Sequence, residues 1–257
     1  MIENINILDS MGNKVSGVFS QPKGASWVVI FSHGFTSSTR RRFYKEMEKN
    51  LNSESVATIR YNYYGHGKNY PNKYGVSPDT TLSKAVESLV AMIKYARNKG
   101  FRKIGLFGSS FGGLISIIAA SREKVGFLVL RSTVAEPKKF WEDRIKKSRI
   151  DLKKWEKLGI VHYKLGNHEE FDLKWEFWVD MQKYNTLLAA KNISCPVLII
   201  HGNSDAVVPI SQARKLGKVL GTSVHAINGA DHSYTIPEHY AKMKSVIMEF
   251  MIKQTRR

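Results

Sequence analysis

The sequence has very little cysteine: Cys195 is the only one in 257 residues. A single cysteine excludes an internal disulfide framework and a zinc site built from several cysteines. Internal repeats and low-complexity tracts are also absent, and 42% of the residues are apolar. This composition is typical of a globular chain and not of a disordered one.

Long hydrophobic runs are missing too. The longest are 27–31, 127–130 and 196–200, and none approaches the roughly 20 residues that a membrane-spanning helix needs. The first residues contain neither a basic segment nor an apolar core of the kind found in signal peptides. Together with the lone cysteine, these absences predict a cytoplasmic protein without stable membrane insertion.

Acidic residues are scarce relative to basic ones, with 22 Asp+Glu against 40 Lys+Arg and a formal net charge of +18. Such a charge suits a nucleic-acid or membrane-surface protein. The basic clusters, however, are scattered and often adjoin acids, and no helix-turn-helix, zinc-finger or RNP-type motif is present. We therefore expect no nucleic-acid partner. The excess charge is interpreted as a solvated surface, and a secondary hypothesis is that it attracts anionic substrates or membranes.

The remaining sequence alternates between short apolar runs and segments with helical periodicity. Alternation of this kind predicts crossover connections and a mostly parallel sheet. Two early segments, 4–8 and 14–19, flank a turn signal and predict an antiparallel hairpin at one sheet edge. The later strands are predicted at 27–31, 56–61, 103–107, 125–130, 196–200 and 223–227, and helices at 41–51, 80–98, 111–121, 211–220 and 239–252.

The alternation stops between 135 and 185, where charges are frequent and no apolar strand run is present. We interpret 134–185 as a cap inserted into a core domain formed by 1–133 and 186–257. Its aromatic residues either line an acyl pocket or form the cap's own core, and Trp141, Trp175 and Trp178 are the candidate substrate-binding residues. The two histidines of this segment, His162 and His168, lack partners at a metal-ligand spacing and are interpreted as surface residues. No metal site is expected.

The most specific motif is Gly108-Ser109-Ser110-Phe111-Gly112, which lies between a predicted strand and a predicted helix. A G-x-S-x-G sequence in that context predicts a nucleophile elbow, with Ser110 as the nucleophile. The turn is so tight that the residues two before and two after the serine must lack side chains. The alternative is a turn of small residues that lets a helix pack closely on a strand.

A serine nucleophile needs a base and an acid that orients the base. His232 follows the last predicted strand and is the candidate base. Asp205 follows the strand at 196–200 and is the preferred acid. Asp231 is the competing acid, but adjacent side chains seldom point at the same place. The order Ser110, Asp205, His232 is that of the α/β-hydrolase arrangement.

An oxyanion hole requires backbone N–H groups that face the developing charge. Phe111, directly after the serine, is one candidate, and Phe35, in the loop after the strand at 27–31, is the other. A further histidine, His66 in Tyr64-Gly65-His66-Gly67, is interpreted as structural. We expect it to hold its loop through a hydrogen bond.

These motifs, in this order, resemble those of the α/β-hydrolase superfamily over nearly the whole chain. The chain is most similar to small serine esterases of the cinnamoyl/feruloyl-esterase and monoacylglycerol-lipase-like type, which carry an insert after the sixth strand. The resemblance implies a mostly parallel eight-stranded sheet with helices on both faces and an inserted cap. It also implies a carboxylic ester hydrolase with a Ser–His–Asp triad and no cofactor.

Two other functions stay open at this level. The same triad cleaves peptide, amide or thioester bonds, and the fold also serves non-catalytic binding proteins. The expected partner is a small-molecule acyl ester. A homodimer is not excluded, and neither the acyl group nor the alcohol is fixed by the sequence.

Overall fold

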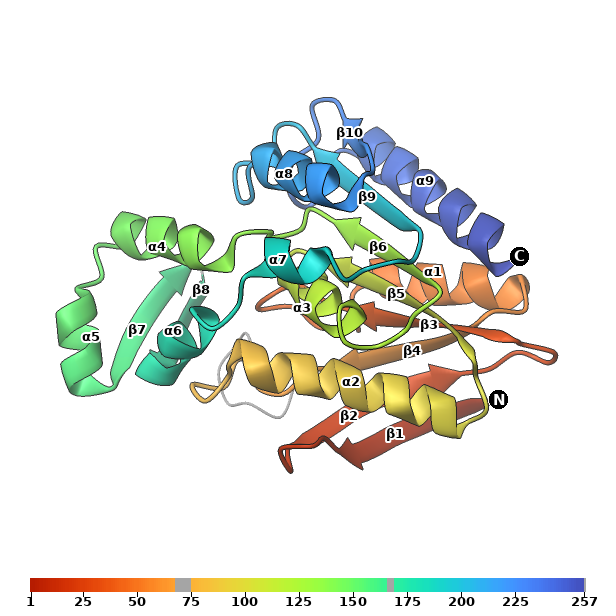
Figure 1. Cartoon of the computed structure of the whole chain (residues 1–257), viewed down its shortest axis with the longest axis horizontal. Coiled ribbons are helices and arrows are strands. Elements are labelled where there is room, and N and C mark those ends of the chain that lie inside the picture. Colours follow the sequence, from red (N-terminus) through yellow and green to blue (C-terminus); the bar gives the residue numbers. More distant parts are fainter. Residues whose placement is uncertain (68–74, 166–168, 257) are drawn as a thin grey trace.

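The computed structural model describes residues 1–67, 75–165 and 169–256. Its main element is an eight-stranded sheet with the order β1-β2-β4-β3-β5-β6-β9-β10 (Figure 1). The β1–β2 pair is antiparallel and most other neighbouring pairs are parallel, as the sequence predicted; the β2–β4 pair is antiparallel as well. The strands are β1 (Ile2–Leu8), β2 (Lys14–Ser20), β3 (Trp27–Ser32), β4 (Ala57–Asn62), β5 (Lys103–Ser109), β6 (Phe127–Arg131), β9 (Val197–Gly202) and β10 (Val224–Ile227).

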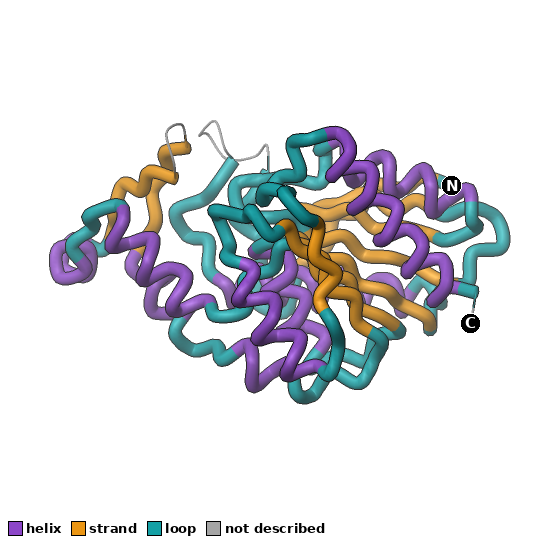
Figure 2. Tube along the Cα trace, turned by 90° about the horizontal axis from the view of Figure 1, so that it is seen from above, coloured by secondary structure: helices purple, strands orange, loops and turns teal. Residues whose placement is uncertain are grey.

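Helices cover both faces of this sheet (Figure 2). One face carries α1 (Arg42–Ser53) and α9 (Pro237–Thr255), and the other carries α2 (Leu82–Asn98), α3 (Phe111–Ala120), α7 (Thr186–Ala190) and α8 (Ile210–Leu220). The α/β-hydrolase fold predicted from the sequence is confirmed. Within the described residues, no helix is both long and apolar enough to cross a membrane.

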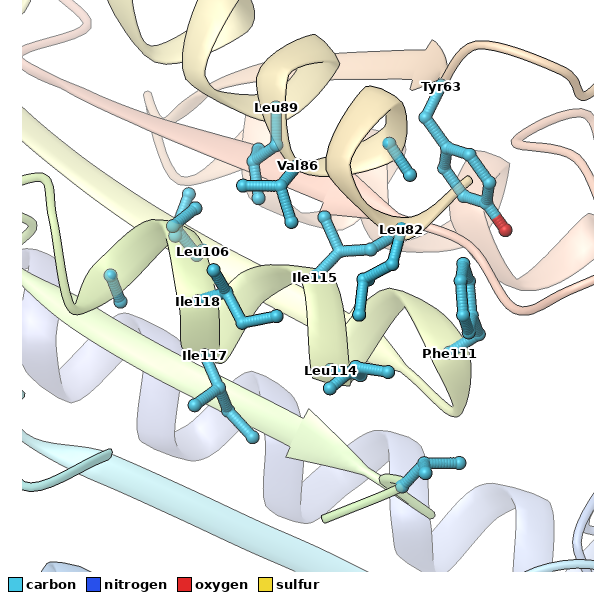
Figure 3. Packing of buried hydrophobic residues seen from close by; sticks show 14 of the residues in the cluster. Tyr63, Leu82, Val86, Leu89, Leu106, Phe111, Leu114, Ile115, Ile117 and Ile118 are labelled. Atoms are coloured by element: carbon cyan, nitrogen blue, oxygen red, sulfur yellow. The ribbon is translucent and has the colours of Figure 1, made fainter. Parts of the chain in front are cut away.

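The central strands are apolar without interruption because both of their faces are buried. In β3, Val28 and Ile30 belong to the core under α2 and α3, whereas Val29 and Phe31 belong to the core under α1 and α9. Every residue of α3 is buried. Figure 3 shows its side chains packed between α2 and the neighbouring strand. This rigid layer fixes the point at which β5 turns into α3.

The segment between β6 and α7 forms a separate layer beyond the ends of the strands (Figure 1). It consists of α4 (Pro137–Lys147), α5 (Leu152–Leu158), β7 (Ile160–Leu165), β8 (Glu169–Lys174) and α6 (Trp175–Met181). The sequence predicted no strand in this segment because it holds no apolar strand run, but β7 and β8 pair as an antiparallel hairpin. Only one face of the hairpin is buried, so buried Tyr163, Phe171 and Leu173 alternate with charged residues and no continuous apolar run arises.

The outer face of the hairpin carries His162, which is exposed as predicted. Its Nδ1 lies 2.9 Å from Asp172 Oδ1, and this hydrogen bond raises the pKa of His162. The two residues are partners across the hairpin, ten positions apart in sequence, so simple spacing did not reveal them. His168 lies outside the described residues.

A buried carboxylate attaches this segment to α2. Asp180, on α6, accepts hydrogen bonds from the backbone N–H (2.7 Å) and the hydroxyl (2.6 Å) of Ser83 in the first turn of α2. The Ser83 hydroxyl also lies 2.7 Å from the Tyr184 hydroxyl. One of these bonds satisfies an N–H group that the start of a helix leaves free, and together they hold the end of α6 against α2.

Candidate active site

The chain turns sharply at Ser110, between β5 and α3. Ser110 has φ 54° and ψ −118°, a conformation that is costly for a residue with a side chain. Its N–H donates to the carbonyl of Arg131 at the end of β6 (2.8 Å). The strained turn lifts the serine hydroxyl above the carboxyl edge of the sheet, at the N-terminus of a buried helix.

The two glycines of the motif are required by close backbone packing. A Cβ at Gly108 would lie 2.5 Å from the carbonyl oxygen of Gly112. A Cβ at Gly112 would lie 2.3 Å from the carbonyl oxygen of Ser32 and 2.4 Å from that of His33. Both distances are far below van der Waals contact, so a side chain at either position would push α3 away from the strands.

The structure brings the predicted base and acid together with Ser110. His232, in the loop after β10, has its Nε2 3.1 Å from Ser110 Oγ and its Nδ1 2.7 Å from Asp205 Oδ2. The three side chains come from the ends of different strands, which meet at the carboxyl edge of the sheet. They form a continuous hydrogen-bonded chain from a hydroxyl to a carboxylate.

The Asp205 carboxylate is buried and fully hydrogen-bonded. Its Oδ1 accepts from the backbone N–H groups of Val207 and Val208, both at 2.8 Å, while Oδ2 faces His232 and, at 3.2 Å, His201. Burial alone would raise the pKa of Asp205, but the hydrogen bonds with His201 and His232 hold it well below its ordinary value. The carboxylate therefore stays ionised opposite His232.

His201 is a further contact of the Asp205 carboxylate, and its role is not evident from the sequence. It is fully buried, and its Nε2 lies 2.9 Å from the carbonyl oxygen of Val208 as well as near Asp205. Both neighbours are acceptors, so Nε2 carries the proton. Its position in the sequence could have indicated this contact, because His201 lies near the end of β9 and only four residues before Asp205.

The competing acid, Asp231, has a different partner. Its carboxylate accepts from the backbone N–H (2.9 Å) and the hydroxyl (2.6 Å) of Thr235. It stabilises the turn before α9, while Asp205 contacts the imidazole of His232. The geometry thus separates the two acids between which the sequence left a choice.

Both candidate oxyanion donors lie beside Ser110. Phe111 is the first residue of α3, so its N–H has no acceptor within the helix. Gly34, immediately before Phe35, is so close that a Cβ there would lie 3.4 Å from Ser110 Cβ. The rings of Phe35 and Phe111 are 5.2 Å apart, so the two residues contact each other.

Aromatic residues of the inserted segment converge on Phe35. Trp141, Phe171 and Phe177 lie with ring centroids 5.5, 5.5 and 5.7 Å from it. Of the three candidate tryptophans, only Trp141 makes a ring contact with Phe35; Trp175 packs on Trp155 at 5.5 Å, and Trp178 is buried in the core cluster. The aromatic residues of the insertion thus pack on one another and on Phe35, and they belong to the same hydrophobic cluster as the core under α2 and α3.

The expected role of His66 is wrong in its detail. The histidine is buried, as a structural role requires, but neither ring nitrogen has a hydrogen-bond partner among the described residues. The loop is held by its backbone instead, through bonds such as His66 N–H to the Tyr63 carbonyl (3.1 Å). The imidazole packs as an aromatic ring, 4.9 Å from Phe35 and 5.6 Å from His33.

Burial of His33 and His66 predicts a loss of stability in mild acid. Burial lowers the pKa of His33 to about 4, and burial and nearby His33 lower that of His66 well below its ordinary value. The unfolded chain takes up these protons below about pH 6.5, so the free energy of unfolding must fall between about pH 6.5 and 4. For His33 the full effect is about 3 kcal/mol.

Urea unfolding between pH 7.5 and 4.5 measures this dependence. We expect His66→Phe, which keeps an aromatic ring, to show a shallower decline than the wild type. His162→Gln is the control with the opposite sign: because the pKa of His162 is raised, its removal should steepen the decline slightly. If the free energy of unfolding falls equally steeply with pH in His66→Phe and the wild type, buried His66 is not a cause of the loss of stability in acid.

Comparison with known proteins places this geometry in a family. The model of the family described as Hydrolase_4, "Serine aminopeptidase, S33", matches residues 23–174, which is more than half of the chain. The chain belongs to this family. It is therefore a hydrolase of the α/β-hydrolase fold.

The individual relatives share about a quarter of their residues with this chain. The chain is 25% identical to the human (Homo sapiens) mitochondrial palmitoyl-protein thioesterase ABHD10 over 89% of its length and 78% of that protein's. It is also 25% identical to the human serine hydrolase BPHL, over 85% of this chain and 78% of that one. Est1E from Butyrivibrio proteoclasticus, solved with bound ferulic acid, is 25% identical with a TM-score of 0.79, covering 98% of this chain and 100% of its own.

Proposed function

We propose that the protein is a serine hydrolase that cleaves carboxylic esters through an acyl-enzyme intermediate. The observation that carries the proposal is the hydrogen-bonded chain from Ser110 Oγ through His232 to Asp205, built on a strained turn at a helix N-terminus. A serine hydroxyl is a weak nucleophile until a neighbouring base takes its proton. His232 is within hydrogen-bond distance to do so.

In the proposed reaction, Ser110 attacks the ester carbonyl as His232 Nε2 accepts the hydroxyl proton. The ionised Asp205 accepts the Nδ1–H of His232, which fixes the tautomer and stabilises the imidazolium. The N–H groups of Phe35 and Phe111 receive the oxyanion. His232 then protonates the leaving alcohol, and water, activated by the same base, releases the acid. The reaction needs no cofactor.

The surroundings of Phe35 support an apolar acyl group. Its ring neighbours are aromatic: Trp141, Phe171 and Phe177 from the inserted segment, together with Phe111 and His66. We propose that residues 134–185 act as a cap over the site and that Trp141 contacts the substrate. An aminopeptidase, the activity in the family's description, is the competing activity, because the same triad also cleaves amide bonds.

A thioester is the second candidate substrate. It is favoured by the relationship to a palmitoyl-protein thioesterase, while the ester is favoured by the likeness to a structure that binds ferulic acid. The same triad serves both, because only the leaving group differs. The acyl group can be identical in an ester and a thioester, so only a direct assay distinguishes the two.

A matched panel of substrates tests the proposal. It contains p-nitrophenyl esters from acetate to long chains, the corresponding thioesters, and aminoacyl p-nitroanilides, each assayed with the wild type. We expect the highest kcat/KM on an ester and no measurable cleavage of the anilides. Turnover of thioesters alone would replace the ester assignment, and preferential cleavage of anilides would restore the aminopeptidase reading.

A further inference from the structure

The peptide group between Gly34 and Phe35 is held from several sides. The carbonyl oxygen of Gly34 is 2.8 Å from His33 Nδ1, 3.2 Å from the Tyr63 hydroxyl and 3.2 Å from the Ser37 N–H. A carbonyl oxygen has two lone pairs and commonly receives one or two donors. Three donors on one oxygen mark a peptide plane that the fold keeps in one orientation.

This peptide is the one that carries the Phe35 N–H. The chain has no cis peptide bond among its described residues, so the N–H points away from the carbonyl of the same group. Donors that fix the carbonyl of Gly34 therefore also fix the direction of the Phe35 N–H. They draw electron density toward the carbonyl oxygen and make that N–H a stronger donor.

We propose that Tyr63 is a positioning residue whose hydroxyl, together with the His33 imidazole, aims the Phe35 N–H at the oxyanion. The inference rests on the proposed ester hydrolysis and deepens it. Tyr63 touches neither the serine nor the substrate in this account; it acts through the Gly34–Phe35 peptide. It lies just after β4, far in sequence from the oxyanion loop.

The Tyr63 ring is fixed by its neighbours, so its hydroxyl has a defined place. It is fully buried and stacked on His33, with ring centroids 4.2 Å apart and planes at 20°. His66 (4.4 Å) and Phe111 (6.0 Å) pack on it as well, and Figure 3 shows it beside Phe111. A side chain locked by packing holds its hydrogen bond at little entropic cost.

Both side-chain donors keep their protons over the neutral pH range. The Gly34 oxygen is an acceptor only, so Nδ1 of His33 must carry the hydrogen. With its pKa lowered to about 4 by burial, His33 is neutral above about pH 5, and burial raises the pKa of Tyr63 well above its ordinary value. Titration of His33 or Tyr63 should therefore add no inflection to the pH–rate profile in the neutral range.

The test compares two buried tyrosines that each lose one hydroxyl. Tyr63→Phe removes the donor to Gly34 and leaves the stacked ring. Tyr61→Phe is the matched control, because Tyr61 is equally buried and its hydroxyl bonds the Ser32 hydroxyl (2.9 Å) without touching the Gly34–Phe35 peptide. The readouts are kcat and KM on the best ester and the inhibition constant of a trifluoromethyl ketone, whose adduct with serine carries an oxyanion.

Removal of a direct oxyanion donor costs about 10²–10³-fold in kcat, and loss of one of three supports should cost less. We expect Tyr63→Phe to lower kcat about tenfold with KM unchanged, and to weaken trifluoromethyl ketone inhibition by a similar factor. We expect Tyr61→Phe to leave all three near wild type. The pH–rate profiles of both variants should keep the wild-type shape.

Equal kcat values for the two variants, or a rise in KM alone for Tyr63→Phe, would overturn the positioning role and leave the ester hydrolase intact. A drop in kcat without weaker ketone inhibition would overturn it too, since the oxyanion would then be held as before. If the wild type cleaves no ester, the proposed function fails, and this inference fails with it.

Discussion

Replacing Ser110 by alanine is expected to lower ester hydrolysis by roughly 10⁴-fold or more. The serine supplies the nucleophile, and the members of such a unit act together, so the loss of one removes most of the catalysis that depends on all three. The alanine should fold normally, because the strain at this turn lies in the backbone (φ 54° at Ser110) and the hydroxyl bonds only His232 among the residues that the structure describes.

The neighbouring serine provides a matched control. Ser109 is buried and its hydroxyl accepts from the Nε and Nη2 of Arg131, at 3.0 and 2.8 Å, on the strand side of the same turn. Ser109→Ala should keep activity within a few-fold of wild type. A fluorophosphonate probe should label the wild type and Ser109→Ala but not Ser110→Ala. Labelling of Ser110→Ala, or equal activity in all three proteins, would remove the serine from the reaction.

The sequence predicts those parts of the site that depend on residues close together in the chain. The elbow needs Gly108 and Gly112 at fixed spacing around Ser110 because the backbone there touches backbone, and spacing is what a sequence displays. The order of Asp205 and His232 follows from the order of strands in the sheet. In the structure, Asp205 and His232 then form a hydrogen-bonded chain with Ser110.

What the sequence did not show depends on contacts between distant segments. The roles of His201 and Tyr63 are not visible in the sequence, since each depends on the atom that the side chain reaches, Asp205 Oδ2 or Gly34 O. His66 was expected to hold its loop through a hydrogen bond, but its imidazole makes aromatic packing contacts instead. The β7–β8 hairpin was missed because one-sided burial dilutes its apolar residues with charges.

Gly112→Ala is expected to lower the free energy of unfolding by about 3 kcal/mol. An alanine favours a helix over glycine by about 1 kcal/mol, so the substitution gains locally. Its Cβ, however, would lie 2.3 Å from the carbonyl of Ser32 and 2.4 Å from that of His33. Both atoms are backbone at the end of β3, which no change of rotamer can move, and overpacking of this kind costs several kcal/mol.

Urea unfolding at neutral pH measures the effect, with Gly24→Ala as the control. Gly24 has φ +76° and no atom within 4 Å of its built Cβ, so alanine there meets only the backbone penalty of about 1–2 kcal/mol. Because relief of the clash at Gly112 must shift the Ser32–His33 backbone, we also expect the variant to lose activity beyond its loss of stability, whereas Gly24→Ala should retain it. A Gly112→Ala protein as stable and active as Gly24→Ala would contradict this prediction. It would show that α3 can move away from β3 without disturbing the oxyanion loop, so the close approach of helix and strand would not be what positions the catalytic residues.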